Sequence, residues 1–308
     1  MTAGDLRDTI YAMATADDTS GVDNADNAGW IPVHFDKWTA DGVTSGEDPL
    51  VVEAPIEYQI EGEPLATVMR TPGNDFDLAV GFLFGEGWID SHSDIGTVCL
   101  GNRAVDSPDG PENAFTNVVD LRPSGAARKR LSIQRRHGPI VTSCGVCGKT
   151  TIEEILKTVP RPSAEWLEAT RQLRLAPRIV LRLPNRLQSF QPLFQRTGAL
   201  HAAGIFDLSG NPLAVFEDIG RHNAVDKVVG SLLREDLVPL SKQILVVSGR
   251  LSFEIVQKAL RAGLPFVVAV SGASHLAVEL ATEGGITLCG FTRETSFTVY
   301  SHPERIGG

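Results

Sequence analysis

The C-terminal half of the chain has the clearest pattern of apolar and polar positions. Short, almost continuously apolar runs lie at 243–249, 265–272 and 286–291, and segments with apolar residues at helical spacing, 251–263 and 274–284, separate them. Strands buried on both faces and alternating with amphipathic helices produce this pattern. It predicts a parallel or mixed sheet covered on both faces, with ligands at the carboxyl ends of its strands.

Two further strands and a helix are expected just upstream of this unit. The alternating run GALHAAGIFD (198–207) and the run LAVFEDIG (213–220) are joined by a turn at Asn211-Pro212. The helix HNAVDKVVGSLLRED (222–236) follows. The C-terminal half is therefore predicted to be an α/β domain.

Weaker patterns organise the first part of the chain. Alternating residues around the turn at 61–64 predict a β-hairpin, and a helix is expected over 76–87 behind a cap at Asn74 or Asp75. A strand is expected over 117–121. Residues 161–196 are rich in Arg and interrupted by Pro, which predicts a linker or crossover between domains.

These segments predict three parts of the chain. Residues 1–48 are expected to be an acidic, flexible tail, because their first half has almost no large apolar side chains. Residues 49–160 are expected to form a smaller, β-rich α+β domain that ends in a Cys-x-x-Cys loop and its helix. Residues 161–308 are expected to form the α/β domain with a mixed sheet.

Charge and cysteine usage narrow the class of protein. The formal net charge of −10 lies mostly in residues 1–50, where ten acidic side chains face two basic ones. The nearly neutral remainder lacks the basic excess of a nucleic-acid-binding protein. No secretory signal and no apolar run of about 18 residues is found, and the four cysteines are too few for a secreted disulfide framework. We expect a soluble cytoplasmic protein with no nucleic-acid or membrane partner.

The motif S-C-G-V-C-G-K carries the strongest candidate for chemistry. Cys144 and Cys147 lie on a small-residue loop near Lys149 and before the predicted start of a helix, features that stabilise a thiolate. A thiolate can attack disulfides or persulfides, or carry a sulfane sulfur itself. Zinc is the competing interpretation, but Cys99 and Cys289 are isolated in sequence, so two ligands would be missing. We expect no metal site.

A second group of candidates lies where predicted strands end. The motif FEDIGRHNAVDK crowds polar side chains into a strand-to-helix turn, although capping and a solvated helix face would explain part of it. Hydroxyl groups and an arginine also follow later strands, a composition that suits phosphate, although ordinary loop chemistry would need them too. The candidate binding residues from these turns are Arg221, His222, Asn223, Ser248, Arg250 and Ser271. His201, alone on its strand, is expected to be structural.

Several long segments in order resemble the FdhD family, the sulfurtransferases required for formate dehydrogenase activity. They are RTPGNDFDLAVGFLFGEGWI, SCGVCGK, TGALHAAGIFD, EDIGRHNAVDKVVG, VVSGRLSFEIVQKALRAGLP and LAVELA. The resemblance covers about Val51 to the C-terminus and leaves out residues 1–48. The segment SGASHLAVELA differs from the sequence that is typical of the family at this place.

The resemblance implies a sulfur carrier with a persulfide on Cys144 or Cys147. Such a protein accepts sulfur from a cysteine desulfurase and delivers it to the molybdenum or tungsten bis-pterin guanine dinucleotide cofactor before formate dehydrogenase receives it. The resemblance also implies a C-terminal domain similar in fold to cytidine deaminases, an α/β sandwich, and a homodimer whose pockets bind the guanine nucleotide ends, for which GDP would be a mimic. The family's cofactor-binding segment matches Phe291, Thr292, Arg293, Glu294, Thr295 and Ser296.

Two other classes of protein stay open as alternatives. A non-catalytic chaperone would bind the molybdenum cofactor without transferring sulfur. A zinc-dependent deaminase would need His-x-Glu upstream of Pro-Cys-x-x-Cys, whereas the chain has His-x-Glu only at His302 to Glu304, and no Pro precedes Cys144.

Overall fold

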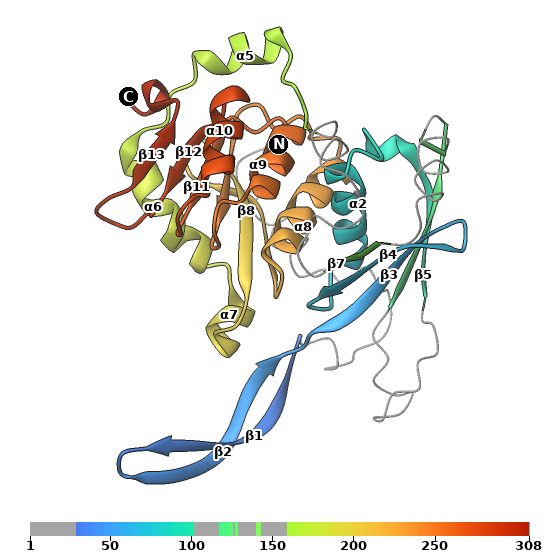
Figure 1. Ribbon diagram of the computed structural model, residues 1–308, viewed down its shortest axis with the longest axis vertical. Helices are drawn as coiled ribbons and strands as arrows, with labels where there is room; N and C mark the ends of the chain where they lie inside the picture. Colours follow the sequence, from blue (N-terminus) through green and yellow to red (C-terminus); the bar gives the residue numbers. More distant parts are fainter. Residues whose placement is uncertain (1–28, 102–116, 126, 129–139, 143–158, 308) are drawn as a thin grey trace, which may run out of the picture.

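The computed structural model describes residues 29–101, 117–125, 127–128, 140–142 and 159–307, with the backbone alone for 140–142. It is a mixed α/β protein with a six-stranded sheet, a five-stranded sheet and a projecting hairpin (Figure 1). No helix among these residues is long and apolar enough to cross a membrane.

The six-stranded sheet forms the centre of the C-terminal half. The parallel strands β10, β11 and β12 are flanked by antiparallel β8 and β9 on one side and by antiparallel β13 on the other. The strands are β8 (His201–Asp207), β9 (Pro212–Asp218), β10 (Gln243–Val247), β11 (Phe266–Ala269), β12 (Thr287–Gly290) and β13 (Thr298–Ser301). The expected mixed sheet is confirmed.

Helices cover both faces of this sheet, which explains why its strands read as continuous apolar runs. In β10, Ile244 and Val246 join a buried cluster with α6, whereas Leu245 and Val247 join the larger core with α8 and α9. The helices and the closing turn are α8 (Arg221–Arg234), α9 (Phe253–Arg261), α10 (His275–Glu283) and η5 (Pro303–Arg305). Each lies where its apolar spacing predicted a helix, apart from the short η5 turn.

The five-stranded sheet belongs to the N-terminal half and has the order β5-β6-β3-β4-β7. Its elements are β3 (Ala54–Ile60), β4 (Glu63–Arg70), α2 (Asp75–Gly85), η2 (His92–Asp94), β5 (Ile95–Gly101), β6 (Val118–Pro123) and β7 (Ile140–Thr142). The predicted hairpin, helix and strand are all present. Asn74 precedes α2 in a left-handed conformation, and its side chain does not cap the helix.

Two sequence-based expectations are wrong. The expected linker at 161–196 instead holds α5 (Ala164–Arg171), α6 (Pro177–Gln188) and α7 (Pro192–Thr197), and α6 buries Val180, Leu183 and Leu187 against the sheet. The apolar residues of α6 form a single stripe, and arginines and prolines lie between them in the sequence. Such residues are frequent in linkers, so the sequence pattern did not indicate a helix.

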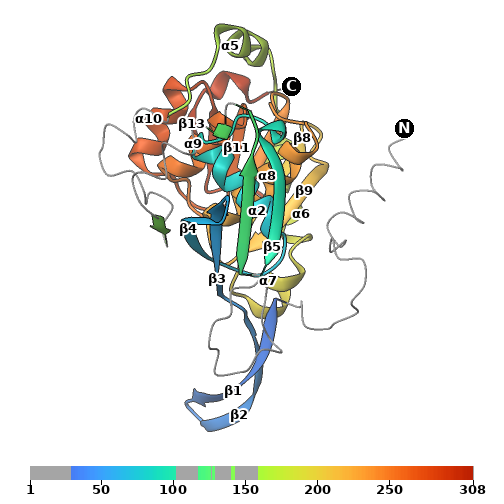
Figure 2. The same cartoon turned by 90° about the vertical axis from the view of Figure 1, so that its right-hand side faces the viewer.

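The second half of the expected flexible tail is also ordered. Residues Trp30–Thr39 and Gly42–Val51 form β1 and β2, a hairpin that projects from the body (Figures 1 and 2). At its base the Arg196 guanidinium lies 3.6 Å from the centre of the Trp30 ring. This cation–π contact fastens the hairpin to α7. Residues 1–28 lie outside the described part of the chain.

Helices α2 and α8 join the two halves by an unusually close crossing. A Cβ atom at Gly81 of α2 would lie 1.9 Å from the Asp226 carbonyl oxygen, and one at Gly230 of α8 would lie 2.0 Å from the Asp77 carbonyl oxygen. Only glycine lets the two backbones approach this far. The crossing lies between the two sheets (Figure 1).

We expect Gly81→Ala to lower the free energy of unfolding by about 1–3 kcal/mol or more, because the added methyl group forces two packed helices apart. Urea denaturation measures this. Gly101→Ala is the control, since a Cβ atom there meets nothing within 4 Å. Equal denaturation midpoints for the two variants would show that the crossing tolerates a side chain.

Candidate functional site

The candidate site lies at the edge of the six-stranded sheet where β10, β11 and β12 end. Because β8 is antiparallel to β10, its first residue, His201, comes to the same edge. The pairing of His201 with Asp218 brings the end of β9 there as well. The candidate residues that follow these strands are therefore gathered at one edge, as parallel-sheet topology requires.

Backbone contacts join the loops of this edge in a row. Leu251 donates its N–H to the Gly272 carbonyl at 3.0 Å, and Phe291 donates to the Ser271 carbonyl at 3.1 Å. The Phe291 ring lies against Gly272, where a Cβ atom would be 2.6 Å from the ring. The ring is still half exposed, at 53%. The row thus presents an accessible aromatic face beside the hydroxyl of Ser271.

Basic side chains surround the first of these loops. At Gly249 a Cβ atom would lie 3.3 Å from Arg221 Cδ and 3.4 Å from His201 Nδ1. Burial lowers the pKa of His201, the nearby Arg221, His222 and Arg250 lower it further, and Asp218 opposes them. Such a concentration of positive charge attracts an anion.

Arg293 adds a fixed cation at the far end of the row. Its guanidinium donates to the Val270 carbonyl at 2.6 Å and to the Thr292 carbonyl at 2.9 Å, and its backbone N–H donates to Ser296 at 2.8 Å. The side chain of the neighbouring Glu294 accepts a hydrogen bond from Asn185 of α6. Arg293 is nevertheless exposed, so its remaining donors can reach a ligand.

The candidate binding residues differ in how far they reach the surface. Those that are exposed or half-buried are Arg221, Ser248, Arg250, Ser271, Phe291, Arg293, Glu294, Thr295 and Ser296. Thr292 is fully buried, and His222 and Asn223 are each 8% exposed. The Ser248 hydroxyl accepts from the Ala202 N–H at 2.9 Å and lies 3.3 Å from His201 Nδ1. His201 therefore holds a loop of the edge, in keeping with its expected structural role.

His222 is held by the start of α9. Its Nε2 lies 3.2 Å from the Ser252 hydroxyl and 3.3 Å from Glu254 Oε2. Burial would raise the pKa of Glu254, but hydrogen bonds from His222 and Ser252 outweigh it and lower the pKa to about 2. The carboxylate thus stays charged and fixes the imidazole at the start of α8.

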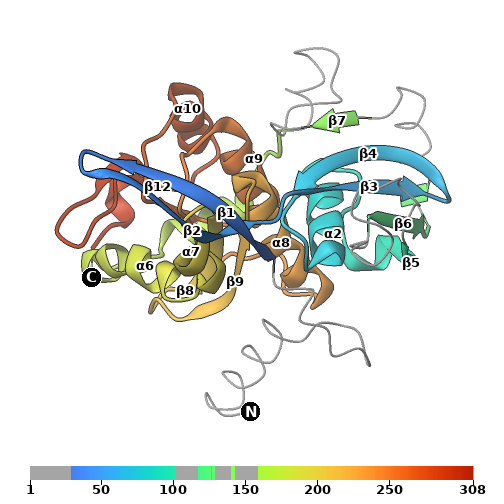
Figure 3. The same cartoon turned by 90° about the horizontal axis from the view of Figure 1, so that it is seen from below.

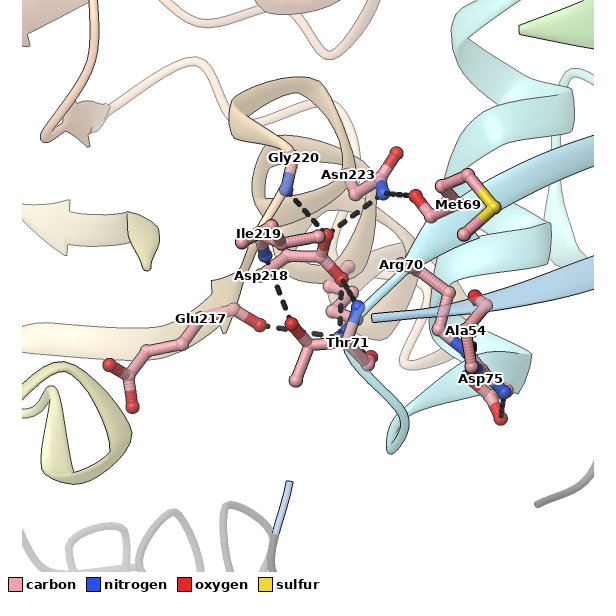
Figure 4. Close-up of polar contacts among 11 residues, drawn as sticks. Ala54, Met69, Arg70, Thr71, Asp75, Glu217, Asp218, Ile219, Gly220 and Asn223 are labelled. Carbon is pink, nitrogen blue, oxygen red and sulfur yellow. Dashed lines mark hydrogen bonds and ion pairs between the residues drawn. The ribbon is translucent and has the colours of Figure 1, made fainter. Parts of the chain in front are cut away.

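Beneath the edge, Asp218 organises a buried polar network (Figure 4). Its carboxylate accepts from the Gly220 N–H at 2.8 Å, from Asn223 Nδ2 at 2.9 Å and from the Thr71 N–H at 3.2 Å. Lys227 Nζ lies 2.9 Å away, and both side chains are buried. Asn223 also donates to the Met69 carbonyl at 2.8 Å, so both amide hydrogens are used inside the protein.

Sequence reasoning missed the partners of this network and of His222. Thr71 lies in the motif RTPGND and Met69 directly precedes it, and the sequence predicted only a helix cap at Asn74 or Asp75 here. Ser252 and Glu254 were not singled out. Arg70 beside Thr71, fully buried and paired with Asp75 at 2.7 Å, shows that the motif is structural (Figure 4). The sequence signal that could have pointed to this motif was a charged arginine next to a turn.

Cys144 and Cys147 lie outside the described residues, but the strand that leads to them does not. Strand β7 runs parallel to β4 and ends at Thr142, which pairs with Val68 (Figure 3). The next residue of β4, Met69, is bonded to Asn223. The chain therefore leaves the five-stranded sheet beside the start of α8. Among the described residues, no three His, Cys, Asp or Glu side chains are grouped as metal ligands.

Comparisons with known proteins give one family. The sequence model of the FdhD/NarQ family matches residues 51–307. Two relatives are each named Sulfur carrier protein FdhD. The one from Streptomyces avermitilis is 43% identical over 268 residues, covering 86% of this chain and 91% of the relative. The one from Nocardia farcinica is also 43% identical over 268 residues, covering 87% and 91%.

A crystal structure has the same fold. It is described as a formate dehydrogenase accessory protein from Desulfotalea psychrophila, and the match has a TM-score of 0.66 at 22% identity. It covers 90% of this chain and 99% of the other.

We expect Asp218→Asn to lower the free energy of unfolding by about 3–5 kcal/mol, because it leaves Lys227 buried without a counter-charge. Urea denaturation at neutral pH measures the loss. Asp236→Asn is the control: Asp236 is exposed and has a φ of 55°, which Asn adopts readily. A loss below about 1 kcal/mol for Asp218→Asn would show that the network does not depend on this charge.

Proposed function

This chain belongs to the FdhD/NarQ family, and we propose that it carries sulfur as a cysteine persulfide to the molybdenum or tungsten bis-pterin guanine dinucleotide cofactor used by formate dehydrogenase. The observation that supports this most is the convergence at the start of α8. There the strand leading to Cys144 and Cys147 ends beside Met69, and the basic edge of the six-stranded sheet begins at Arg221.

The loading step is an exchange between two thiol groups. The thiolate of Cys144 attacks the terminal sulfur of a persulfide on a cysteine desulfurase. A new sulfur–sulfur bond forms on Cys144 as the bond in the donor breaks, and the donor cysteine leaves as a thiolate. The number of persulfides and the charge are unchanged, so no oxidant is needed. Cys147 serves as the helper thiol. This chemistry suits the reducing cytoplasm.

The basic edge receives the cofactor as a substrate. Arg221, Arg250 and Arg293 supply positive charge for its phosphates, while the half-exposed Phe291 ring offers a face for the guanine base. The nearby hydroxyl groups of Ser248, Ser271, Thr295 and Ser296 complete the polar lining. We assign buried His222 and Asn223 to positioning the α8 turn that presents Arg221. Formate dehydrogenase is the final acceptor, and the protein acts as a homodimer.

We expect Cys144→Ala to abolish persulfide loading. After incubation with a cysteine desulfurase and cysteine, intact-mass analysis should show one added sulfur atom on the wild type and none on this variant. Cys147→Ala should load sulfur but activate formate dehydrogenase poorly, and Cys99→Ala, at an exposed position on β5, should behave as wild type. Loading retained in Cys144→Ala and lost in Cys147→Ala would exchange the two roles. No added sulfur on the wild type itself would favour a chaperone that only binds the cofactor.

We expect the edge to bind GDP more tightly than ADP in calorimetry. Arg221→Gln and Arg293→Gln should each weaken GDP binding about tenfold or more, since each removes a charge-assisted hydrogen bond worth roughly 1.5–3 kcal/mol. Lys242→Gln removes an exposed charge away from the edge and should change nothing. Thermal melts should be alike for all three. Equal affinity for GDP and ADP would contradict the assignment of a guanine site.

A further inference from the structure

The outer face of α6 carries a row of arginines, here called the arginine stripe: Arg178, Arg182 and Arg186. All three are exposed, and they repeat every four residues, so they lie along one side of the helix at about 6 Å intervals. Val180, Leu183 and Leu187 are buried against the sheet. The stripe is therefore the face of α6 that turns away from the body.

This arrangement of arginines destabilises α6. Like charges four residues apart repel one another, and Arg178 lies in the first turn, where the helix dipole disfavours a cation. The first turn contains no acidic residue. From residue 169 to residue 206 the chain has six arginines and no Asp or Glu. Within the described part of the chain, no ion pair involves any arginine of the stripe.

An acidic segment of the same chain starts close by. Residues 1–28 hold six aspartates and a single arginine. They join the described structure at Gly29 and Trp30, which are fastened to α7 through Leu193 and Arg196. Helix α7 begins four residues after α6 ends.

The segment is long enough to cover the stripe. A chain of 28 residues can extend to roughly 90 Å, whereas α6, with 12 residues, is about 18 Å long. Tethering near the stripe also raises the local concentration of the segment to the order of millimolar. The charge, the length and the point of attachment of residues 1–28 therefore all favour this segment as the occupant of the arginine stripe.

We propose that the acidic segment 1–28 binds the arginine stripe of α6 within the same molecule. Asn185, on the same helix, is bonded to Glu294 in the loop of the basic edge. The bound segment would therefore place negative charge beside that loop. Residues 1–28 lie outside the family match at 51–307, so this contact would be an addition to the family's common body.

The test uses a fluorescent peptide of residues 1–28 and the full chain. In one variant of the chain, Asp5, Asp8, Asp17, Asp18, Asp23 and Asp26 are replaced by Asn, which leaves the stripe vacant. Anisotropy should show peptide binding to this variant. Binding to wild type should be at least about tenfold weaker, because its own segment competes at millimolar effective concentration. Equal binding to both chains would overturn the proposal.

Further substitutions in the vacant-stripe variant locate the site. Arg178→Gln, Arg182→Gln and Arg186→Gln together should weaken peptide binding about tenfold or more. The control set Lys37→Gln, Arg161→Gln and Lys242→Gln removes the same charge at other exposed positions and should leave binding unchanged. No substituted chain should melt below the vacant-stripe variant, which shows that weaker peptide binding is not caused by unfolding. If both sets weaken binding equally, the peptide senses only net charge and the stripe is not its site.

Salt and protein concentration complete the test. Raising the salt from 0.1 M to 1 M shortens the Debye length from about 10 Å to about 3 Å, less than the spacing of the arginines, and should abolish peptide binding. The weaker binding of wild type should not depend on its concentration. A dependence on concentration would mean that the segment of a second copy occupies the stripe, which would overturn the intramolecular assignment.

Discussion

The approach of α2 to α8 at Gly81 and Gly230 is the contact on which the arrangement of this protein depends. With no side chain at either position, the two backbones meet directly, and each helix packs against carbonyl groups of the other. The turn before α2 then falls beside the turn before α8. That placement lets Thr71 donate to Asp218, 147 residues away in the sequence, and Asn223 donate to Met69. A larger residue at the crossing would separate the turns as well as the helices.

In the network around Asp218 the buried charges are paired with one another, unlike the basic groups at the sheet edge that are available to a ligand. Lys227 neutralises Asp218, and Lys258 neutralises Asp226 at 2.6 Å, so the interior near α8 holds matched pairs. The backbone and amide donors around Asp218 offset the cost of burying it. At the sheet edge, by contrast, Arg221, Arg250 and Arg293 have no ion pair with another described residue. Arg221, one turn from the network, therefore faces the edge with its charge uncancelled by Asp218, which already has Lys227.

The sequence-based expectations were correct where the interactions are local in the sequence, and they were incomplete where the interactions join residues that are far apart in the sequence. Strands such as β10 and helices such as α9 were predicted because their apolar spacing is local and is fixed by burial on one or two faces. Helix α6 was missed because only Val180, Leu183 and Leu187 mark its buried face, between arginines and prolines. The motif around Asp218 was recognised as unusually polar. Its division into a buried network and the half-buried Arg221 depended on Thr71 and Met69, which no local pattern connects to it.

The two basic surfaces differ in how firmly their cations are held, and this difference suits them to different anions. At the edge, Arg221 packs against Gly249, and two carbonyl groups fix Arg293. A fixed guanidinium can match the geometry of a phosphate, and little side-chain freedom is lost when it binds. On α6 the described residues offer the stripe no such contacts, so its side chains can follow an irregular polypeptide. Asn185 of α6 donates to Glu294, the neighbour of Arg293, so the two surfaces are joined by this contact. They are therefore linked in the structure while their cations suit different anions.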